Sequence, residues 1–173
     1  MNQTEVERAF TEHHQAVYRF AWRMSTSPEM AEDVTQDVFV GLLRGDLRFE
    51  PSRGTLRGFL LGVTRNLTLK RLRAESRWAS LDEEQVVARP LDLDGARTGE
   101  LVGSAVRALP PLQRDVLILA EYEDLSLEEI AHTVEATVGA VKARLHRARE
   151  NLRRMLAPLR AESSQGVRID GTA

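Results

Sequence analysis

Apolar residues recur at every third or fourth position through most of this chain of 173 residues, which is the spacing of helices that bury one face. In the first half, these stripes predict helices at residues 6–24, 28–44 and 56–77. Ser27 and Pro28 supply an N-cap and a first-turn proline for the second helix, and Pro51 interrupts the pattern before the third. We therefore expect a first helical domain over residues 1–79.

The helical pattern weakens over residues 80–98, which are acidic and contain Pro90 and Gly95, so we interpret them as a linker. A second helical domain is expected over residues 99–157. Its helices are predicted at residues 99–108, 112–122, the stretch that follows Ser126, and 137–156. Residues 158–173 are expected to form a disordered tail. The expected fold class is all-α, with two small helical domains joined by an acidic linker.

The last predicted helix combines an apolar stripe with a basic face. Six Lys or Arg residues stand between positions 137 and 156, against one acidic residue, Glu150. Preceded by a short helix with a capping box, this is the pattern of a helix-turn-helix that reads DNA. The candidate DNA contacts are Lys142, Ala143, His146, Arg147 and Arg149. Arg153 and Arg154 lie further along the same helix. They either contact phosphates or form a solvated end of the helix.

The net charge of −2 hides a strong segregation of charge along the chain. Residues 53–77 carry a net charge of +6 and residues 137–156 a net charge of +5, whereas residues 78–136 carry −9. Two basic helices on one chain indicate two contacts with a polyanion. The alternative is that both are ordinary solvated helix faces.

Within the predicted helix 56–77, the side-chain amide of Asn66 is a candidate for reading a base edge, and Lys70 and Arg73 are candidates for holding phosphates. The alternative for Asn66 is a hydrogen bond within its own domain. On the predicted helix 28–44, Asp33, Gln36 and Asp37 share one face. This acidic face is either simply solvated or a docking face for a basic partner.

The sequence contains no pattern of catalytic or cofactor chemistry. It has no cysteine, its four histidines lack the spacing of metal ligands, and it has neither a glycine-rich phosphate loop nor a nucleophile elbow. We therefore expect no enzyme activity, no catalytic residue, no metal, no cofactor and no small-molecule substrate. The polar N-terminus and the short apolar runs predict a cytoplasmic protein without a signal peptide or membrane insertion.

The chain is similar to the bacterial sigma factors of the extracytoplasmic-function (ECF) group over about residues 6–79 and 99–156. The stretch AEDVTQDVFVGLLRG (31–45) resembles the polymerase-binding helix of that family, region 2.2. The stretch GFLLGVTRNLTLKRLR (58–73) resembles regions 2.3 and 2.4. The stretches LPPLQRDVLILAEYEDLSLEEIA (109–131) and VGAVKARLHRARENLR (138–153) resemble region 4.

This resemblance implies a specificity subunit that binds core RNA polymerase and promoter DNA, and that an anti-sigma factor inhibits. Polymerase binding would fall to Asp33, Gln36 and Asp37, and opening of the −10 element to the basic segment 53–77. The helix-turn-helix would bind the −35 element as duplex.

The chain departs from the family pattern in the second domain. No glycine stands between the two helices, where the sequence reads Thr133-Val134-Glu135-Ala136, and Ala140 and Ala143 replace small hydroxyl residues. Two other functions stay open at this stage. One is a helix-turn-helix regulator that binds duplex DNA without joining polymerase, and the other is a sigma-like decoy that titrates a regulator.

Overall fold

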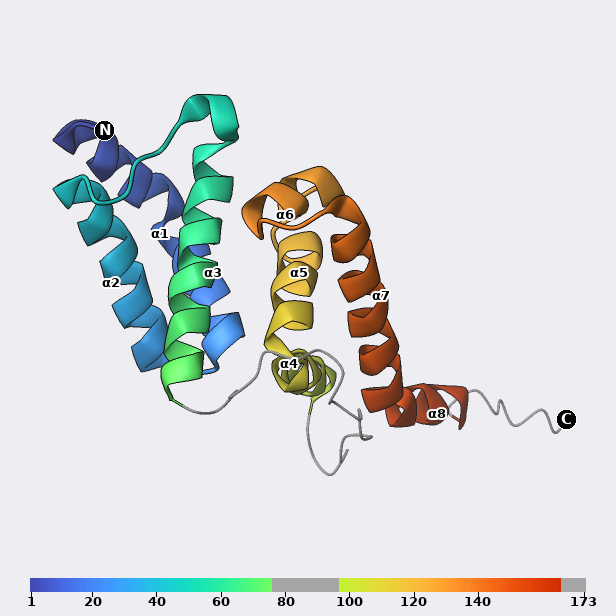
Figure 1. Ribbon diagram of the computed structural model, residues 1–173. Coiled ribbons are helices and arrows are strands. Elements are labelled where there is room, and N and C mark those ends of the chain that lie inside the picture. The colour runs from blue at the N-terminus through green and yellow to red at the C-terminus, as the bar shows by residue number, and fades with distance from the viewer. Residues whose placement is uncertain (76–96, 166–173) are drawn as a thin grey trace, which may run out of the picture.

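The computed structural model of this chain describes residues 1–75 and 97–165, and within these ranges it is helical with no strand. The N-terminal group consists of α1 (Gln3–Ser25), α2 (Pro28–Arg44), the short 3₁₀ helix η1 (Pro51–Arg53) and α3 (Leu56–Ala74). The C-terminal group consists of α4 (Thr98–Ala108), α5 (Pro111–Glu121), α6 (Leu127–Thr133), α7 (Val138–Met155) and α8 (Ala157–Gln165). The two groups lie side by side, with α3 against α6 and α1 against α5 (Figure 1). The expected all-α architecture is confirmed.

Local capping signals set the helix starts, as predicted for Ser27 and for the capping box after Ser126. The Ser27 hydroxyl accepts a hydrogen bond of 3.2 Å from the backbone N–H three residues on. Ser126 and Glu129 make both hydrogen bonds of the capping box that begins α6. Thr137 caps α7 by accepting from the backbone N–H of Ala140 at 3.1 Å.

The helix limits differ from the prediction mainly at the ends. The first helix begins at Gln3 rather than at residue 6, because Asn2 caps it with a full capping box. Residues 76 and 77 of the predicted third helix lie outside the described residues. So does the predicted linker 80–98, apart from residues 97 and 98.

The tail is the clearest correction. Residues 158–165, expected to be disordered, belong to α8. Ala and Leu in its first turns favour a helix, and Pro158 is tolerated there because a first-turn residue needs no backbone N–H donor. Residues 166–173 lie outside the described residues.

The N-terminal group buries an apolar core of its own between α1, α2 and α3. The side chains that α2 buries there, as their spacing predicts, are those of Ala31, Val34, Val38 and Leu42. From α3, Leu60 and Leu72 complete this core.

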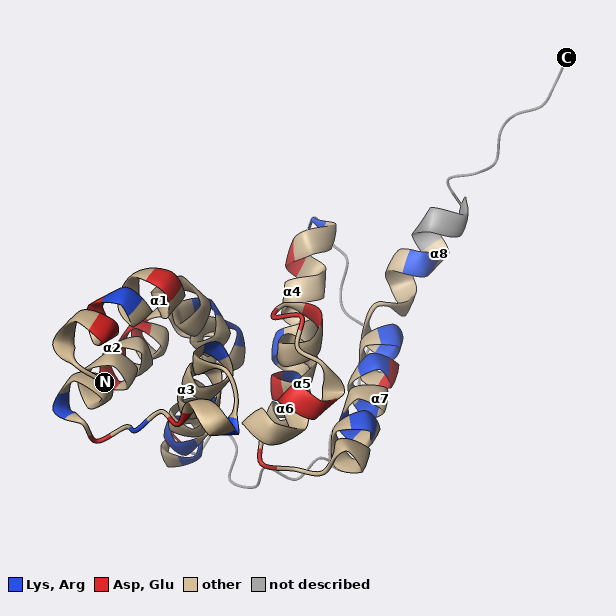
Figure 2. Ribbon diagram, turned by 90° about the horizontal axis from the view of Figure 1, so that it is seen from above, with Lys and Arg blue, Asp and Glu red and all other residues tan. Residues whose placement is uncertain are grey.

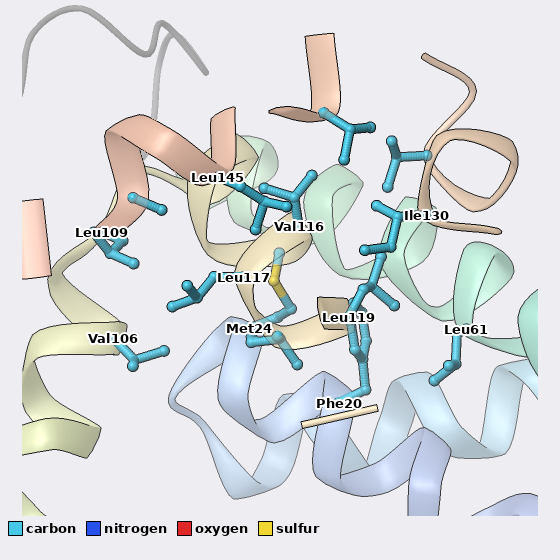
Figure 3. Packing of buried hydrophobic residues seen from close by; sticks show 14 of the residues in the cluster. Phe20, Met24, Leu61, Val106, Leu109, Val116, Leu117, Leu119, Ile130 and Leu145 are labelled. Atoms are coloured by element: carbon cyan, nitrogen blue, oxygen red, sulfur yellow. The ribbon is translucent and has the colours of Figure 1, made fainter. Parts of the chain in front are cut away.

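A second apolar cluster extends across both groups of helices. Phe20 and Met24 of α1 point toward Leu117 and Leu119 of α5, and Leu61 of α3 belongs to the same cluster (Figure 3). Phe20, Met24 and Leu61 are fully buried. The sequence predicts two separate helical domains, whereas in the structure they share one hydrophobic cluster.

Candidate nucleic-acid interface

The helix-turn-helix consists of α6, a turn over residues 134–137, and α7. Glu135 in this turn adopts the left-handed conformation, with φ of 53°. The family pattern usually has a glycine in this turn, since glycine adopts positive φ without steric cost. This chain keeps the turn with a non-glycine residue at a cost in local strain.

One face of α7 packs against the rest of the C-terminal group. Val141, Leu145 and Ala148 are buried, and Val138, Leu152 and Leu156 pack against the same cluster. The predicted apolar stripe is therefore confirmed. A hydrogen bond of 2.8 Å from the side-chain amide of Asn151 to Gln113 adds a buried polar link between α7 and α5.

The other face of α7 is exposed and basic (Figure 2). All five candidate DNA contacts of this helix are exposed: Lys142, Ala143, His146, Arg147 and Arg149. The Arg149 guanidinium also donates to the Glu121 carboxylate at 2.7 Å, and both side chains are about half exposed. Arg153 and Arg154 lie near Glu150 on the same helix, with N–O distances of 2.9 and 4.0 Å.

On α3, the three candidate −10 residues Asn66, Lys70 and Arg73 are exposed. The side-chain oxygen of Asn66 accepts a hydrogen bond of 3.1 Å from the neighbouring Arg65. Asn66 therefore makes a contact within its own helix, which is the alternative that the sequence left open, while its side chain stays accessible.

Three other arginines of α3 are held by carboxylates of the same chain. Arg57 donates to Glu123 at 2.5 Å, and Arg65 donates to Asp115 at 2.5 Å. Arg71 lies within 2.5 Å of Asp37 and 3.5 Å of Asp33. From the sequence alone, these arginines resemble three more phosphate ligands. Their carboxylate partners lie far away in the sequence, so the ion pairs become visible only in the structure.

The acidic face of α2 is exposed at Asp33, Gln36 and Asp37, as its spacing predicts. Arg71 neutralises part of its charge from the neighbouring helix. The same face of α2 also carries two exposed apolar side chains, those of Val40 and Leu43. The face thus offers both a carboxylate pair and apolar surface to a partner.

Asp115 is fully buried between helices of both groups. Burial raises the pKa of its carboxyl, and the positive charges of Arg65 and Arg144 oppose that rise. Next to it, burial lowers the pKa of Arg114 to about 10. Arg114 donates to the backbone carbonyls of Met24 and Leu109, so it also connects the two groups of helices.

A groove of about 990 Å³ runs between the loop before α3, the helix α3 itself and the turn of the helix-turn-helix. Phe59 and Val63 contribute apolar surface to it, and Asn66 and His132 contribute polar groups. Among residues 1–75 and 97–165, no three His, Asp or Glu side chains gather to hold a metal ion. None of the helices in these ranges combines the length and apolar composition needed to cross a membrane.

Both halves of the chain match models of known protein families. Residues 9–77 match the family model of sigma-70 region 2, and residues 99–152 match that of sigma-70 region 4. The ECF RNA polymerase sigma factor SigE of Mycolicibacterium smegmatis is 35% identical over 164 residues, covering 90% of this chain and 63% of that relative. The chain thus spans less than two thirds of SigE. The ECF sigma factor SigW of Bacillus subtilis is 30% identical over 158 residues, covering 83% of this chain and 84% of SigW.

A solved structure is also similar in sequence and fold. It is the co-crystal structure of the sigma factor RpoE in complex with the anti-sigma factor NepR from Bartonella quintana. The match has a TM-score of 0.66 and 25% identity, and it covers 88% of this chain and 97% of the matched chain.

Proposed function

This chain belongs to the ECF group of RNA polymerase sigma factors, and we propose that it binds core RNA polymerase and directs it to a restricted set of promoters. One observation carries the proposal. The helices α3 and α7 both present exposed cationic and polar side chains, and they lie in the segments that match region 2 and region 4. If the chain were a regulator that binds only duplex DNA, the match of its first half to region 2 would have no explanation.

Polymerase binding is assigned to the exposed face of α2. Asp33, Gln36 and Asp37 supply charge and hydrogen-bond acceptors, while Val40 supplies apolar contact area. A basic polymerase surface would compete with Arg71 for the two carboxylates. Docking thus exchanges an ion pair within the chain for one across the interface.

Recognition of the −10 element is assigned to the N-terminal domain, residues 1–79. Asn66 offers an amide to a base edge, and Lys70 and Arg73 hold phosphates of the displaced strand. The three lie at spacings of four and three residues, which places them along one side of α3.

Recognition of the −35 element is assigned to the C-terminal domain, residues 99–157. Insertion of the N-terminal half of α7 into the major groove brings Lys142, Ala143, His146 and Arg147 to the bases. Arg149 lies further along and would reach a phosphate after leaving Glu121.

In this role the chain supplies specificity and no catalytic residue, needs no cofactor, and acts in the cytoplasm with the polymerase. Its control by an anti-sigma factor is part of the proposal. The similar chain from Bartonella quintana was solved in complex with such an inhibitor.

Run-off transcription with core polymerase and a library of genomic fragments tests the proposed function. A sigma factor yields discrete transcripts that depend on both core enzyme and this chain. Fragment binding without transcripts would identify a regulator of duplex DNA. Core binding without promoter selection would identify a decoy.

A further inference from the structure

We propose that the docking surface for core RNA polymerase extends from the acidic face of α2 onto α1, where Phe10, together with Leu43 of α2, forms an apolar anchor that His14 positions. The inference rests on the proposed function and deepens it, since it names the side chains that hold the polymerase after the two proteins have met. The acidic face guides the encounter, and the apolar anchor sets how long the complex lasts.

Large apolar side chains are exposed at the end of the N-terminal group where α1 begins and α2 ends. Phe10 of α1 is 47% exposed, and Leu43 and Val40 of α2 are 57% and 39% exposed. Only two residues join α1 to α2, so the two helices run antiparallel and lie side by side (Figure 1). Phe10 and Leu43 therefore lie near the same end of this helix pair. Exposed apolar patches of this kind mark surfaces that a partner covers.

The ring of Phe10 is held in place from two sides. The His14 ring stacks on it, with 4.7 Å between the ring centroids and an interplanar angle of 11°. Phe39 of α2, which is buried, meets the Phe10 ring edge-on, with 5.0 Å between the centroids. An exposed aromatic ring that is already ordered loses little rotamer freedom when a partner covers it, so more of its burial appears as binding free energy.

A hydrogen bond within α1 fixes the His14 ring. Its Nδ1 atom lies 2.8 Å from the backbone carbonyl oxygen of Phe10, one turn earlier on the helix. Because a carbonyl oxygen only accepts, Nδ1 carries the proton and donates. The stacked ring then limits the rotamers open to Phe10, so His14 acts through Phe10 as a positioning residue.

The apolar anchor is continuous with the acidic face of α2. At 100° per residue, Val40 and Leu43 follow Asp33 around the circumference of α2 in that order. The next position around the helix is Phe39, whose ring contacts Phe10 of α1. The surface thus passes from carboxylates through exposed apolar side chains to the aromatic pair on α1.

Core polymerase is the occupant that these observations favour. Phe10 and Leu43 both lie within residues 9–77, which match sigma-70 region 2, and they border the acidic face assigned to polymerase binding. A second copy of this chain fits poorly, because a two-fold dimer through this patch would bring the acidic face of α2 close to its own copy. A partner surface with cationic and apolar side chains side by side complements both parts of the patch at once.

The two parts of this surface should act on different rate constants. Attraction between exposed charges operates at long range, steers the encounter and is screened by salt. Burial of apolar surface operates only at contact, so it slows dissociation and has little dependence on ionic strength. Kinetic measurements can therefore distinguish the apolar anchor from the acidic face.

Surface plasmon resonance with immobilised core polymerase tests the assignment. Phe10→Ser and Leu43→Ser should each raise the dissociation rate constant by at least about fivefold, with an unchanged association rate constant. Asp33→Lys with Asp37→Lys should instead lower the association rate constant, most strongly at low salt. Leu43 is more than half exposed, so Leu43→Ser keeps the test valid even if Phe10→Ser perturbs the packing of α1 on α2.

Trp22→Ser is the matched control. Trp22 is another exposed aromatic residue of α1, but it lies on a different face, twelve residues after Phe10 and thus about 18 Å along the helix axis. Its replacement should leave both rate constants for core binding unchanged.

Two variants at position 14 test the positioning role. His14→Ala removes the stacked ring and should raise the dissociation rate constant, whereas His14→Phe keeps a ring against Phe10 and should recover most of the loss. Equal losses in both variants would show that the stacked ring does not position Phe10.

Wild-type dissociation rates in Phe10→Ser and Leu43→Ser, or an equal increase in Trp22→Ser, would overturn the proposal. Sedimentation of the free chain checks the second copy as an occupant, and self-association that Leu43→Ser abolishes would make the patch a dimer contact. If the wild-type chain does not bind core polymerase at all, the proposed function fails. If it binds and the anchor variants bind with the same kinetics, only the apolar anchor fails.

Discussion

Asn151 of α7 donates a hydrogen bond of 2.8 Å to the side-chain oxygen of Gln113 on α5, and both side chains are buried. In a helix with otherwise apolar buried positions, this polar pair fixes both the rotation and the height of α7 relative to α5. The geometry of the side chains that we propose as DNA contacts depends on that placement.

We expect Asn151→Ala to lower the free energy of unfolding by about 1–3 kcal/mol, because a buried acceptor on Gln113 loses its donor. Urea denaturation monitored by circular dichroism measures the change. The double variant Gln113→Met with Asn151→Leu removes both polar partners and should recover part of the loss. A single variant as stable as the wild type would show that the pair contributes nothing to the packing of α7.

The second prediction concerns the acidic face of α2. Asp33→Lys with Asp37→Lys should weaken binding to core polymerase, because it presents like charge to a basic partner surface. Titration of labelled protein with core enzyme measures the dissociation constant.

Arg71→Gln is the matched control for that experiment. It releases both aspartates from their partner within the chain, so it should leave core binding unchanged or strengthen it. Wild-type affinity in the double lysine variant would mean that this face is merely solvated. Weakening by Arg71→Gln would mean that the arginine, and not the acids, meets the polymerase.

The third prediction concerns the turn of the helix-turn-helix. Glu135 has a φ of 53°, a conformation that costs a non-glycine residue about 1–2 kcal/mol. Glu135→Gly should therefore raise the free energy of unfolding by about 1 kcal/mol, after the loss of backbone entropy in glycine is subtracted. Thermal and urea unfolding measure the gain. Glu135→Ala, which keeps a Cβ atom, should give no such gain, and equal effects of both changes would exclude backbone strain as the cause.

The sequence predicts contacts between residues that are close together in the chain, and it does not predict contacts between residues that are far apart. Ser27, Ser126 and Thr137 act on backbone atoms three residues away, so their caps can be recognised directly from the sequence. The buried stripe of α7 follows from periodicity for the same reason. Arg65 and Asp115 are 50 residues apart, and no local pattern distinguishes an arginine that binds a carboxylate from one that binds a phosphate.

The sequence does not reveal the shared cluster of Phe20, Met24 and Leu119, for a related reason. Each of these residues fits the apolar stripe of its own helix. The stripe shows that this face is buried, but it does not show which other helix packs against it. The contact between the two groups of helices becomes visible only when both are placed in space (Figure 3).

The fourth prediction concerns the −10 element. Lys70→Ala with Arg73→Ala should reduce promoter opening, because two phosphate contacts with the displaced strand are lost. Permanganate reactivity of unpaired thymines in the open complex measures the opening. Duplex binding of the −35 element by α7 should persist, as a gel shift with a fragment that carries only that element would show. Unchanged permanganate reactivity would remove the pair from the −10 interface.

The last prediction separates base readers from phosphate contacts on α7. If Arg147 reads a base edge, Arg147→Ala should cost about 1–3 kcal/mol of binding and relax the preference at one base pair. Arg153 lies about two turns further along and pairs with Glu150 at 2.9 Å. Arg153→Ala should weaken binding to every sequence alike and lower the salt slope by about one unit, if this side chain leaves Glu150 for a phosphate.

Binding of both variants to a panel of −35 sequences, at several salt concentrations, distinguishes these outcomes. Glu150→Gln is the matched control, since it frees Arg153 without removing it. If Arg153 contacts a phosphate, this control should bind at least as tightly as the wild type. Equal losses on every sequence for Arg147→Ala would make Arg147 a phosphate contact. An unchanged salt slope for Arg153→Ala would leave that residue as a solvated end of the helix.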